Sequence, residues 1–169
     1  MDTAKGSWIY KNTPDNSHRF LLGESGKKML TCLGVNPSTA EPERLDRTLE
    51  SVKRIASHNG FDGWLMWNVS SQRATNPKSL AAEPDYEMHA RNLAYIMQSV
   101  ADHNISHLWL AYGNNIDQHS YLQVFLQDIL TILIPFELRH KMIGLTQKGH
   151  PRHPLYVPGD STLRPLSKI

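Results

Sequence analysis

Short apolar runs alternate with amphipathic stretches along most of this chain, and this alternation limits the possible folds more than any other feature. Four runs have the length and composition of strands, at residues 28–35, 64–69, 107–113 and 141–146. Three stretches place apolar side chains at helical spacing, at residues 45–58, 85–100 and 121–133. Strands that alternate with helices are joined by right-handed crossovers. We therefore predict an α/β fold, a three-layer α/β/α sandwich with a mostly parallel central sheet.

The first part of the chain has a different pattern. Apolar runs at residues 8–10 and 19–23 are separated by Asn-Thr-Pro-Asp-Asn, a sequence rich in turn-forming residues. We expect an N-terminal antiparallel hairpin at one edge of the sheet. The length of 169 residues suits one domain, and no repeat or linker divides the chain. The prediction is a single α/β domain over residues 1–169.

Composition excludes several classes of protein. Apolar residues make up 40% of the chain and the net charge is only +2, so nucleic acid is permitted as a partner but not required. With Cys32 as its one cysteine, the chain cannot form an internal disulfide or a cysteine-held zinc or iron–sulfur site, and we expect no metal and no cofactor. No run approaches the roughly 20 apolar residues of a membrane span. We expect a cytoplasmic protein that does not bind membranes, and the sequence indicates no oligomeric state.

Polar residues follow each of the four predicted central strands. These strand ends are rich in Asn, Ser, Thr, Arg, His and Gly, at residues 34–39, 68–75, 112–115 and 146–154. Ligands of such sheets bind beyond the carboxyl ends of the strands, where the strand order reverses. We therefore predict a site at this edge, centred on the segment Gly-Val-Asn-Pro-Ser-Thr at residues 34–39.

Two of these strand ends contain residues suited to chemistry. Asn36 precedes Pro37 and must be extended, so its amide can offer a donor and an acceptor to a ligand. The alternative is that Asn-Pro-Ser-Thr is simply a turn. His150 and His153 each precede a proline. Either can donate a hydrogen bond to a developing anion, or can be a solvated loop residue.

Three other polar residues have two interpretations each. Arg73 can grip an anionic ligand with its planar fork, or cover the sheet edge with its aliphatic stem. Asp46 and Thr48 stand at the start of a predicted helix. There they serve as an N-terminal cap and first-turn partners of the helix dipole, or as ligand contacts.

The motifs as a set resemble a known family. They are Gly-Val-Asn-Pro-Ser-Thr-Ala (34–40), Asp-Arg-Thr (46–48), Asn-Val (68–69), Arg-Ala-Thr-Asn-Pro (73–77), Tyr-Gly (112–113) and Gly-His-Pro-Arg-His-Pro-Leu-Tyr (149–156). In this order, over about residues 18–158, they resemble a bacterial and phage family of proteins of unknown function, DUF1643. That resemblance implies no established activity.

A more distant resemblance is to the uracil-DNA glycosylases. Their motifs are, in order, Gly-x-Asp/Asn-Pro, Asn-Val or Leu-Asn, a strand ending in Gly, and His-Pro-Ser. Residues 34–37, 67–69 and 110–113 are similar to the first three, and His150-Pro151 or His153-Pro154 to the fourth. The resemblance implies a uracil-DNA-glycosylase-like fold and recognition of a nucleobase, a nucleotide or modified DNA, with cleavage of an N-glycosidic bond as the reaction.

The glycosylase resemblance also implies roles for individual residues. Asn36 would position the attacking water, His153 would donate to the departing base as the second catalytic residue, and Asn68 would read the base edge. We prefer His153 because His-Pro-Leu-Tyr is the more characteristic segment of DUF1643. The serine that usually follows His-Pro is absent, which leaves the loop that grips DNA in doubt. The full predicted substrate-binding set is Gly34, Pro37, Ser38, Thr39, Asp46, Thr48, Asn68, Arg73, Thr75, Gly113 and His150.

Two alternatives of other classes fit the same sequence. One is a non-catalytic module that binds a nucleotide, a small anion or modified DNA. The other is an enzyme that acts on a free nucleotide or a small metabolite, which the mild net charge of +2 favours over a long DNA contact.

Overall fold

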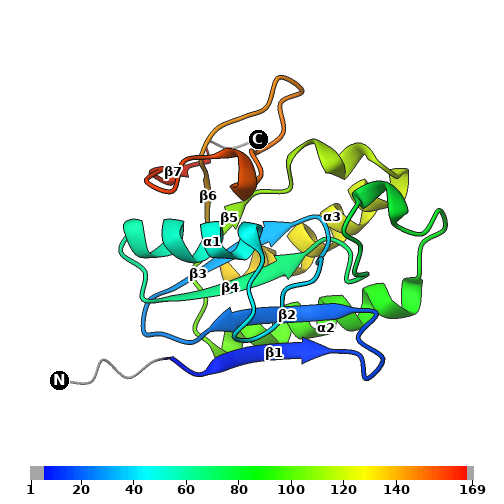
Figure 1. The fold of residues 1–169 in the computed structure, drawn as a ribbon, viewed down its shortest axis with the longest axis horizontal. Helices are drawn as coiled ribbons and strands as arrows, with labels where there is room; N and C mark the ends of the chain where they lie inside the picture. Colours follow the sequence, from blue (N-terminus) through cyan, green and yellow to red (C-terminus); the bar gives the residue numbers. More distant parts are fainter. Residues whose placement is uncertain (1–5, 167–169) are drawn as a thin grey trace.

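The computed structural model describes residues 6–166, and within this range seven strands form one sheet in the order β1-β2-β4-β3-β5-β6-β7 (Figure 1). The strands are β1 (Trp8–Asn12), β2 (Arg19–Glu24), β3 (Met29–Gly34), β4 (Gly63–Asn68), β5 (His107–Leu110), β6 (Arg139–Met142) and β7 (Arg164–Pro165). The helices are α1 (Arg47–His58), α2 (Tyr86–Asp102) and α3 (Ser120–Leu133). The predicted α/β class is confirmed.

The sheet is mixed. Strands β4, β3, β5 and β6 are parallel neighbours, whereas the pairs β1–β2, β2–β4 and β6–β7 are antiparallel. The predicted N-terminal hairpin is confirmed, with β1 at the sheet edge. The expectation of a mostly parallel sheet holds only for the four central strands. Strand β2 of the hairpin runs antiparallel to β4, and the two-residue strand β7 runs antiparallel to β6.

Side chains on the two faces of the sheet contact different helices. On one face, Trp64, Met66 and Trp109 pack against the buried side of α1. On the other face, Trp67 and Leu108 belong to the cluster that includes the buried side chains of α2 and α3. Figure 1 shows the same division, with α1 in front of the sheet and α2 and α3 behind it. No helix within residues 6–166 is long and apolar enough to cross a bilayer.

The predicted helix boundaries follow local signals. Helix α1 begins after Asp46, whose side chain accepts a hydrogen bond from the backbone N–H of Leu49 at 2.9 Å, so the predicted cap is confirmed. Asn59 ends the helix, and Gly60 follows with φ of +84°.

Two strands end earlier than predicted. Strand β5 stops at Leu110 instead of continuing to residue 113, because Gly113 adopts a φ of +59° and starts a 3₁₀ turn over Gly113–Asp117. Strand β6 is displaced toward the N-terminus of the predicted run 141–146, because Gly144 breaks the extended backbone with a φ of +152°. Both shifts leave polar loops at the carboxyl ends of the strands.

Candidate functional site

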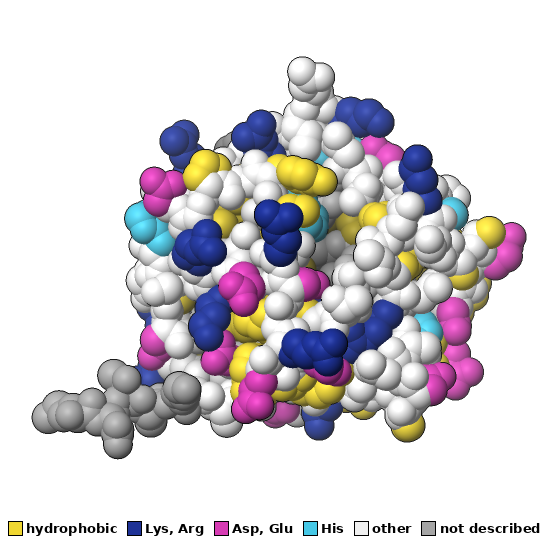
Figure 2. Space-filling view, viewed as in Figure 1, with side chains coloured by type: hydrophobic (Ala, Val, Ile, Leu, Met, Phe, Trp, Pro, Cys, Tyr) yellow, Lys and Arg dark blue, Asp and Glu magenta, His cyan; other side chains and the backbone are white. Residues whose placement is uncertain are grey.

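The strand order reverses at β3, which has β4 on one side and β5 on the other. The connection after β3 contains α1, on one face of the sheet, and the connection after β5 contains α3, on the opposite face. A crevice is expected where these connections separate. A cleft of about 420 Å³ lies at this edge, lined by the ends of β3 and β4, the start of α1 and the segment 153–156. Figure 2 shows a hollow on this face, with Lys, Arg and a few acidic side chains around it.

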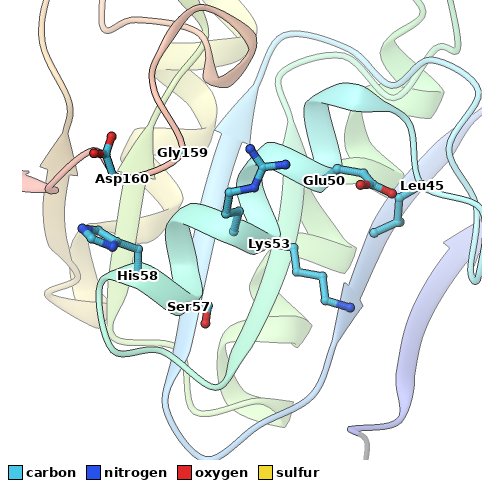
Figure 3. Close-up of a pocket in the computed structure, with 8 residues that line it drawn as sticks. Leu45, Glu50, Lys53, Ser57, His58, Gly159 and Asp160 are labelled. Carbon is cyan, nitrogen blue, oxygen red and sulfur yellow. The ribbon is translucent and has the colours of Figure 1, made fainter.

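A second hollow, of about 820 Å³, lies over the outer side of α1, and Figure 3 shows its lining. Its charged side chains are exposed, and Lys53 already forms an ion pair with Glu24 at 2.8 Å. None of its lining residues has a buried polar atom without a hydrogen-bond partner. The cleft differs in this respect, and it is therefore the candidate site.

Asn68, the last residue of β4, is a buried polar residue of the cleft. It is 1% exposed, and neither its Oδ1 nor its Nδ2 has a hydrogen-bond partner within residues 6–166. Its register partner on β3 is Gly34, where a β-carbon would lie 3.2 Å from Asn68 Oδ1 and 2.7 Å from the Cε of Met66. Gly34 thus leaves the space that the amide occupies. An unsatisfied buried amide is costly, so this side chain is suited to a ligand that supplies both partners.

Asn36 lines the same cleft but is held in place by the protein. Its Nδ2 donates to the carbonyl of Pro37 at 2.9 Å and to the carbonyl of Ala74 at 2.8 Å. Both N–H groups of the amide are therefore used, and Oδ1 is the atom left to accept a hydrogen bond from water or a ligand. Asn36 thus joins the loop after β3 to the loop after β4.

His153 reaches the cleft from the C-terminal loop. Its Nδ1 accepts the backbone N–H of Leu155 at 3.2 Å, so the neutral ring carries its proton on Nε2. Burial lowers the pKa of His153 to about 4, and the nearby negative charge of Asp46 opposes this shift only in part. At neutral pH the ring is an uncharged hydrogen-bond donor. The exposed ring of Tyr156 lies 5.9 Å from it, centroid to centroid.

Arg19, the first residue of β2, provides a buried positive charge. It is 2% exposed, donates from Nη1 to the carbonyl of Ala40 at 3.1 Å, and has a buried Nε without a partner. Burial, together with the like charge of Arg73, lowers the pKa of its guanidinium to about 10, and the negative charge of Asp46 opposes this shift in part. Within residues 6–166 no carboxylate lies within 4.0 Å of this group.

The structure brings most of the predicted site residues together. The predicted residues that line the cleft are Asn36, Ser38, Thr39, Asp46, Thr48, Asn68, Thr75 and His153. Gly34, Pro37 and Gly113 support it through the backbone: Gly34 leaves space for Asn68, Pro37 O accepts from Asn36, and Gly113 packs against His153.

Two predicted residues lie apart from the lining. Arg73 donates to Ser38 O at 2.6 Å, to Ala40 O at 3.1 Å and to the hydroxyl of Tyr10 at 2.8 Å. These bonds fix the loop after β3 from outside the cleft. His150 instead pairs with Asp117 at 2.8 Å, and neither residue lines the cleft.

Sequence reasoning missed four polar residues of the lining, Arg19, Arg47, Asn115 and Tyr156. The one available signal for Arg19 was a charged residue at the start of an otherwise apolar strand. Tyr156 was visible only as the end of the motif at residues 149–156. Asn115 stands in a predicted polar strand end, but nothing there distinguished it from its neighbours.

Comparison with known proteins gives the family. The model of a family described as protein of unknown function (DUF1643) matches residues 19–155, more than half of the chain. Searches of the curated proteins and of the solved structures gave no match. The matched segment includes every lining residue discussed above except Tyr156. The chain belongs to the DUF1643 family.

Proposed function

We propose that the protein recognises a nucleobase in the cleft and cleaves its N-glycosidic bond, in the manner of the uracil-DNA glycosylases. The observation that carries this proposal is the amide of Asn68, which is 1% exposed and has no hydrogen-bond partner for either polar atom among the described residues. A planar amide is complementary to a base edge that presents an adjacent donor and acceptor, as a flipped or free base does. A cleft of about 420 Å³ has the size of a small-molecule site.

The neighbouring side chains have the properties that such a reaction needs. Cleavage of the bond builds positive charge on the sugar and negative charge on the departing base. The free Oδ1 of Asn36 is an acceptor that can orient the attacking water, while the Nε2–H of neutral His153 can donate to a base oxygen. Because an amide is not a strong base, the reaction would depend on stabilisation of the leaving group and would be slow.

The proposal includes the finer description of the fold. The uracil-DNA glycosylases have a three-layer α/β/α sandwich, and the packing of α1 on one face with α2 and α3 on the other supports this assignment. The predicted motifs after β3, β4 and β5 fall at the carboxyl ends of neighbouring parallel strands, which also supports it.

A second candidate function is binding of a nucleotide or modified DNA without cleavage. The observation that favours it is the lack of a free carboxylate base. Asp46 is the one acidic residue that lines the cleft in the described part of the chain, and its Oδ1 is bonded to the N–H of Leu49. In this case the same residues would bind the base, and no free base would be released.

Release of free bases from a panel of modified single-stranded and duplex DNAs, measured by mass spectrometry, separates the two functions. If the protein cleaves, Asn36→Ala and His153→Ala each lower the rate by about 10²- to 10³-fold, the scale for losing one aligned electrostatic group. His150→Ala is the matched control, because that histidine pairs with Asp117 outside the cleft, and it should retain the rate. Base binding without release in the wild type would establish the binding function and end the glycosylase proposal.

A further inference from the structure

The cleft contains a positive charge that base recognition does not use. Arg19 and the exposed Arg47 line it, and Asp46 supplies the one carboxylate of the lining in the described residues. Half-buried His153 is neutral, so two positive charges face one negative charge. Burial of a charge without a partner is among the most unfavourable arrangements in a protein. Arg19 is close to this situation: it is 2% exposed, its side chain donates only to the carbonyl of Ala40, and within residues 6–166 its Nε has no partner and no carboxylate lies within 4.0 Å.

The start of α1 adds further donors on the same cleft. Helix α1 has 12 residues, and its first backbone N–H groups, those of Arg47 and Thr48, donate no hydrogen bond within residues 6–166. The N–H of Leu49 is already bonded to Asp46. Free N–H groups at the positive end of a helix bind oxyanions, and a guanidinium binds them through parallel N–H bonds.

We propose that the cleft has an oxyanion subsite formed by Arg19 and the N-terminus of α1, and that it holds a phosphate group of the ligand. This inference rests on the proposed function for the base-binding half of the site, because the same cleft contains the unpaired amide of Asn68. The ligand class is then a nucleotide: Asn68 reads the base and Arg19 neutralises the phosphate. Both a free nucleoside monophosphate and a single strand of DNA carry this group.

Arg73 offers a matched control for Arg19. Both guanidinium groups donate to the carbonyl of Ala40 at 3.1 Å, so this carbonyl keeps one donor when either arginine is replaced. Arg73 also bonds Ser38 O and the Tyr10 hydroxyl and does not line the cleft. If Arg19 had a purely structural role, Arg19→Met and Arg73→Met would both unfold at a lower temperature than wild type. If Arg19 forms an oxyanion subsite, only Arg19→Met loses the preference for a phosphate-bearing ligand, and only Arg73→Met unfolds at a lower temperature.

Thermal unfolding and calorimetric titration of the full chain test this difference. In phosphate-free buffer, Arg19→Met should unfold at the same temperature as wild type or higher, because it removes an unpaired buried charge. Arg73→Met should unfold at a lower temperature. Wild type and Arg73→Met should bind deoxyuridine 5′-monophosphate about 10- to 100-fold more tightly than deoxyuridine, the scale of hydrogen bonds to a charged group. Arg19→Met should bind the two equally.

The outcomes separate failure of this subsite from failure of the proposed function. Equal affinity of wild type for deoxyuridine and its monophosphate, or an unchanged preference in Arg19→Met, would overturn the subsite and leave base recognition standing. Ribose 5-phosphate binding as tightly as the nucleotide, with no effect of Asn68→Leu, would remove base recognition and leave the subsite. A short single-stranded DNA containing deoxyuridine identifies the source of the phosphate. Tighter binding of the strand than of the mononucleotide, lost in Arg19→Met, assigns the subsite to DNA, and the reverse order assigns it to a free nucleotide.

Discussion

Gly113 lies so close to His153 that a β-carbon on the glycine would be 3.2 Å from the β-carbon of the histidine. The glycine also has a φ of +59°, and its N–H donates to Pro151 O at 2.8 Å, two residues before His153. The loop after β5 and the segment that contains His153 are therefore fitted to each other without a side chain between them.

Gly113→Ala should displace His153 and strain the backbone together. We expect a loss of roughly 1–3 kcal/mol in the free energy of unfolding, and a fall in base release or ligand binding. Gly149→Ala is the matched control, because Gly149 also has a positive φ of +83° but no atom lies within 4 Å of its added β-carbon. It should lose only about 1 kcal/mol and keep the function of the cleft. Base release or ligand binding is measured for both variants, and urea denaturation gives their free energies of unfolding. An equal loss of base release or binding in the two variants would contradict the role of the Gly113 contact.

Asn36→Asp should be more harmful to folding than Asn36→Ala. The amide nitrogen donates to Pro37 O and Ala74 O, so an aspartate would place a negative oxygen against two carbonyl oxygens. We expect Asn36→Ala to lose about 1–2 kcal/mol and Asn36→Asp roughly 1–3 kcal/mol more at pH 7. Lowering the pH to 5 should restore part of the free energy of unfolding in Asn36→Asp, because a protonated carboxyl can donate a hydrogen bond to one of these carbonyls. Urea denaturation at the two pH values measures this, and identical curves for both variants would refute the assigned amide orientation.

Asn68→Leu should stabilise the free protein. The substitution removes two unpaired buried polar atoms and keeps a similar shape, so we expect a gain of roughly 1–3 kcal/mol with loss of base binding. Asn92→Leu is the control: Asn92 is equally buried and its Oδ1 also has no partner within residues 6–166, but its Nδ2 donates to Asn68 O at 2.8 Å. Because this bond is lost, the variant should not be stabilised. Thermal unfolding of both variants and wild type without ligand measures these changes. A lower unfolding temperature of Asn68→Leu would mean that the amide has a structural partner.

His153 should make the protein less stable in mild acid. Its folded pKa of about 4 lies below the ordinary value of 6.5, so below pH 6.5 the unfolded chain takes up a proton that the folded chain does not. The stabilisation is complete above pH 6.5 and is lost as the pH falls toward 4, by about 3 kcal/mol in total. His153→Gln should flatten this part of the curve of unfolding free energy against pH. A curve parallel to wild type between pH 6.5 and 4 would show that His153 is not buried in the neutral form.

Much of the fold was predictable because its signals are local. Apolar runs, the cap at Asp46 and the stop at residues 59–60 depend on neighbouring residues, and the structure places α1 and the strands β3 and β4 where these signals do. The two-residue strand β7 carries Arg164 and Pro165, and no periodicity can be read from so short a segment. The direction in which β2 runs beside β4 depends on contacts between residues far apart in the sequence.

The site was predictable where it follows strand ends, and not where it depends on tertiary pairing. Asn36 follows the end of β3 and Asn68 ends the parallel neighbour β4, so the expected topology alone brings them together. The choice between Arg19 and Arg73 has no local signal. Arg19 lines the cleft because β2 pairs with β4, whereas the guanidinium of Arg73, which does not line the cleft, is bonded to Ser38 O, Ala40 O and the Tyr10 hydroxyl. Whether an arginine meets a ligand or a backbone carbonyl is decided by that packing.

The three bonds of Arg73 mechanically couple the outermost strand to the rim of the cleft. One bond ends on Tyr10 of β1 and the other two on Ser38 and Ala40, so an opening of the edge hairpin pulls on the loop that holds Asn36. A shortened chain that starts after β1 would retain every cleft-lining residue and the two bonds from Arg73 to this loop, but lose the bond that ties Arg73 to Tyr10. Amide hydrogen exchange in residues 36–40 should therefore report on fraying of the N-terminal strand, a motion that begins at the opposite edge of the molecule from β7.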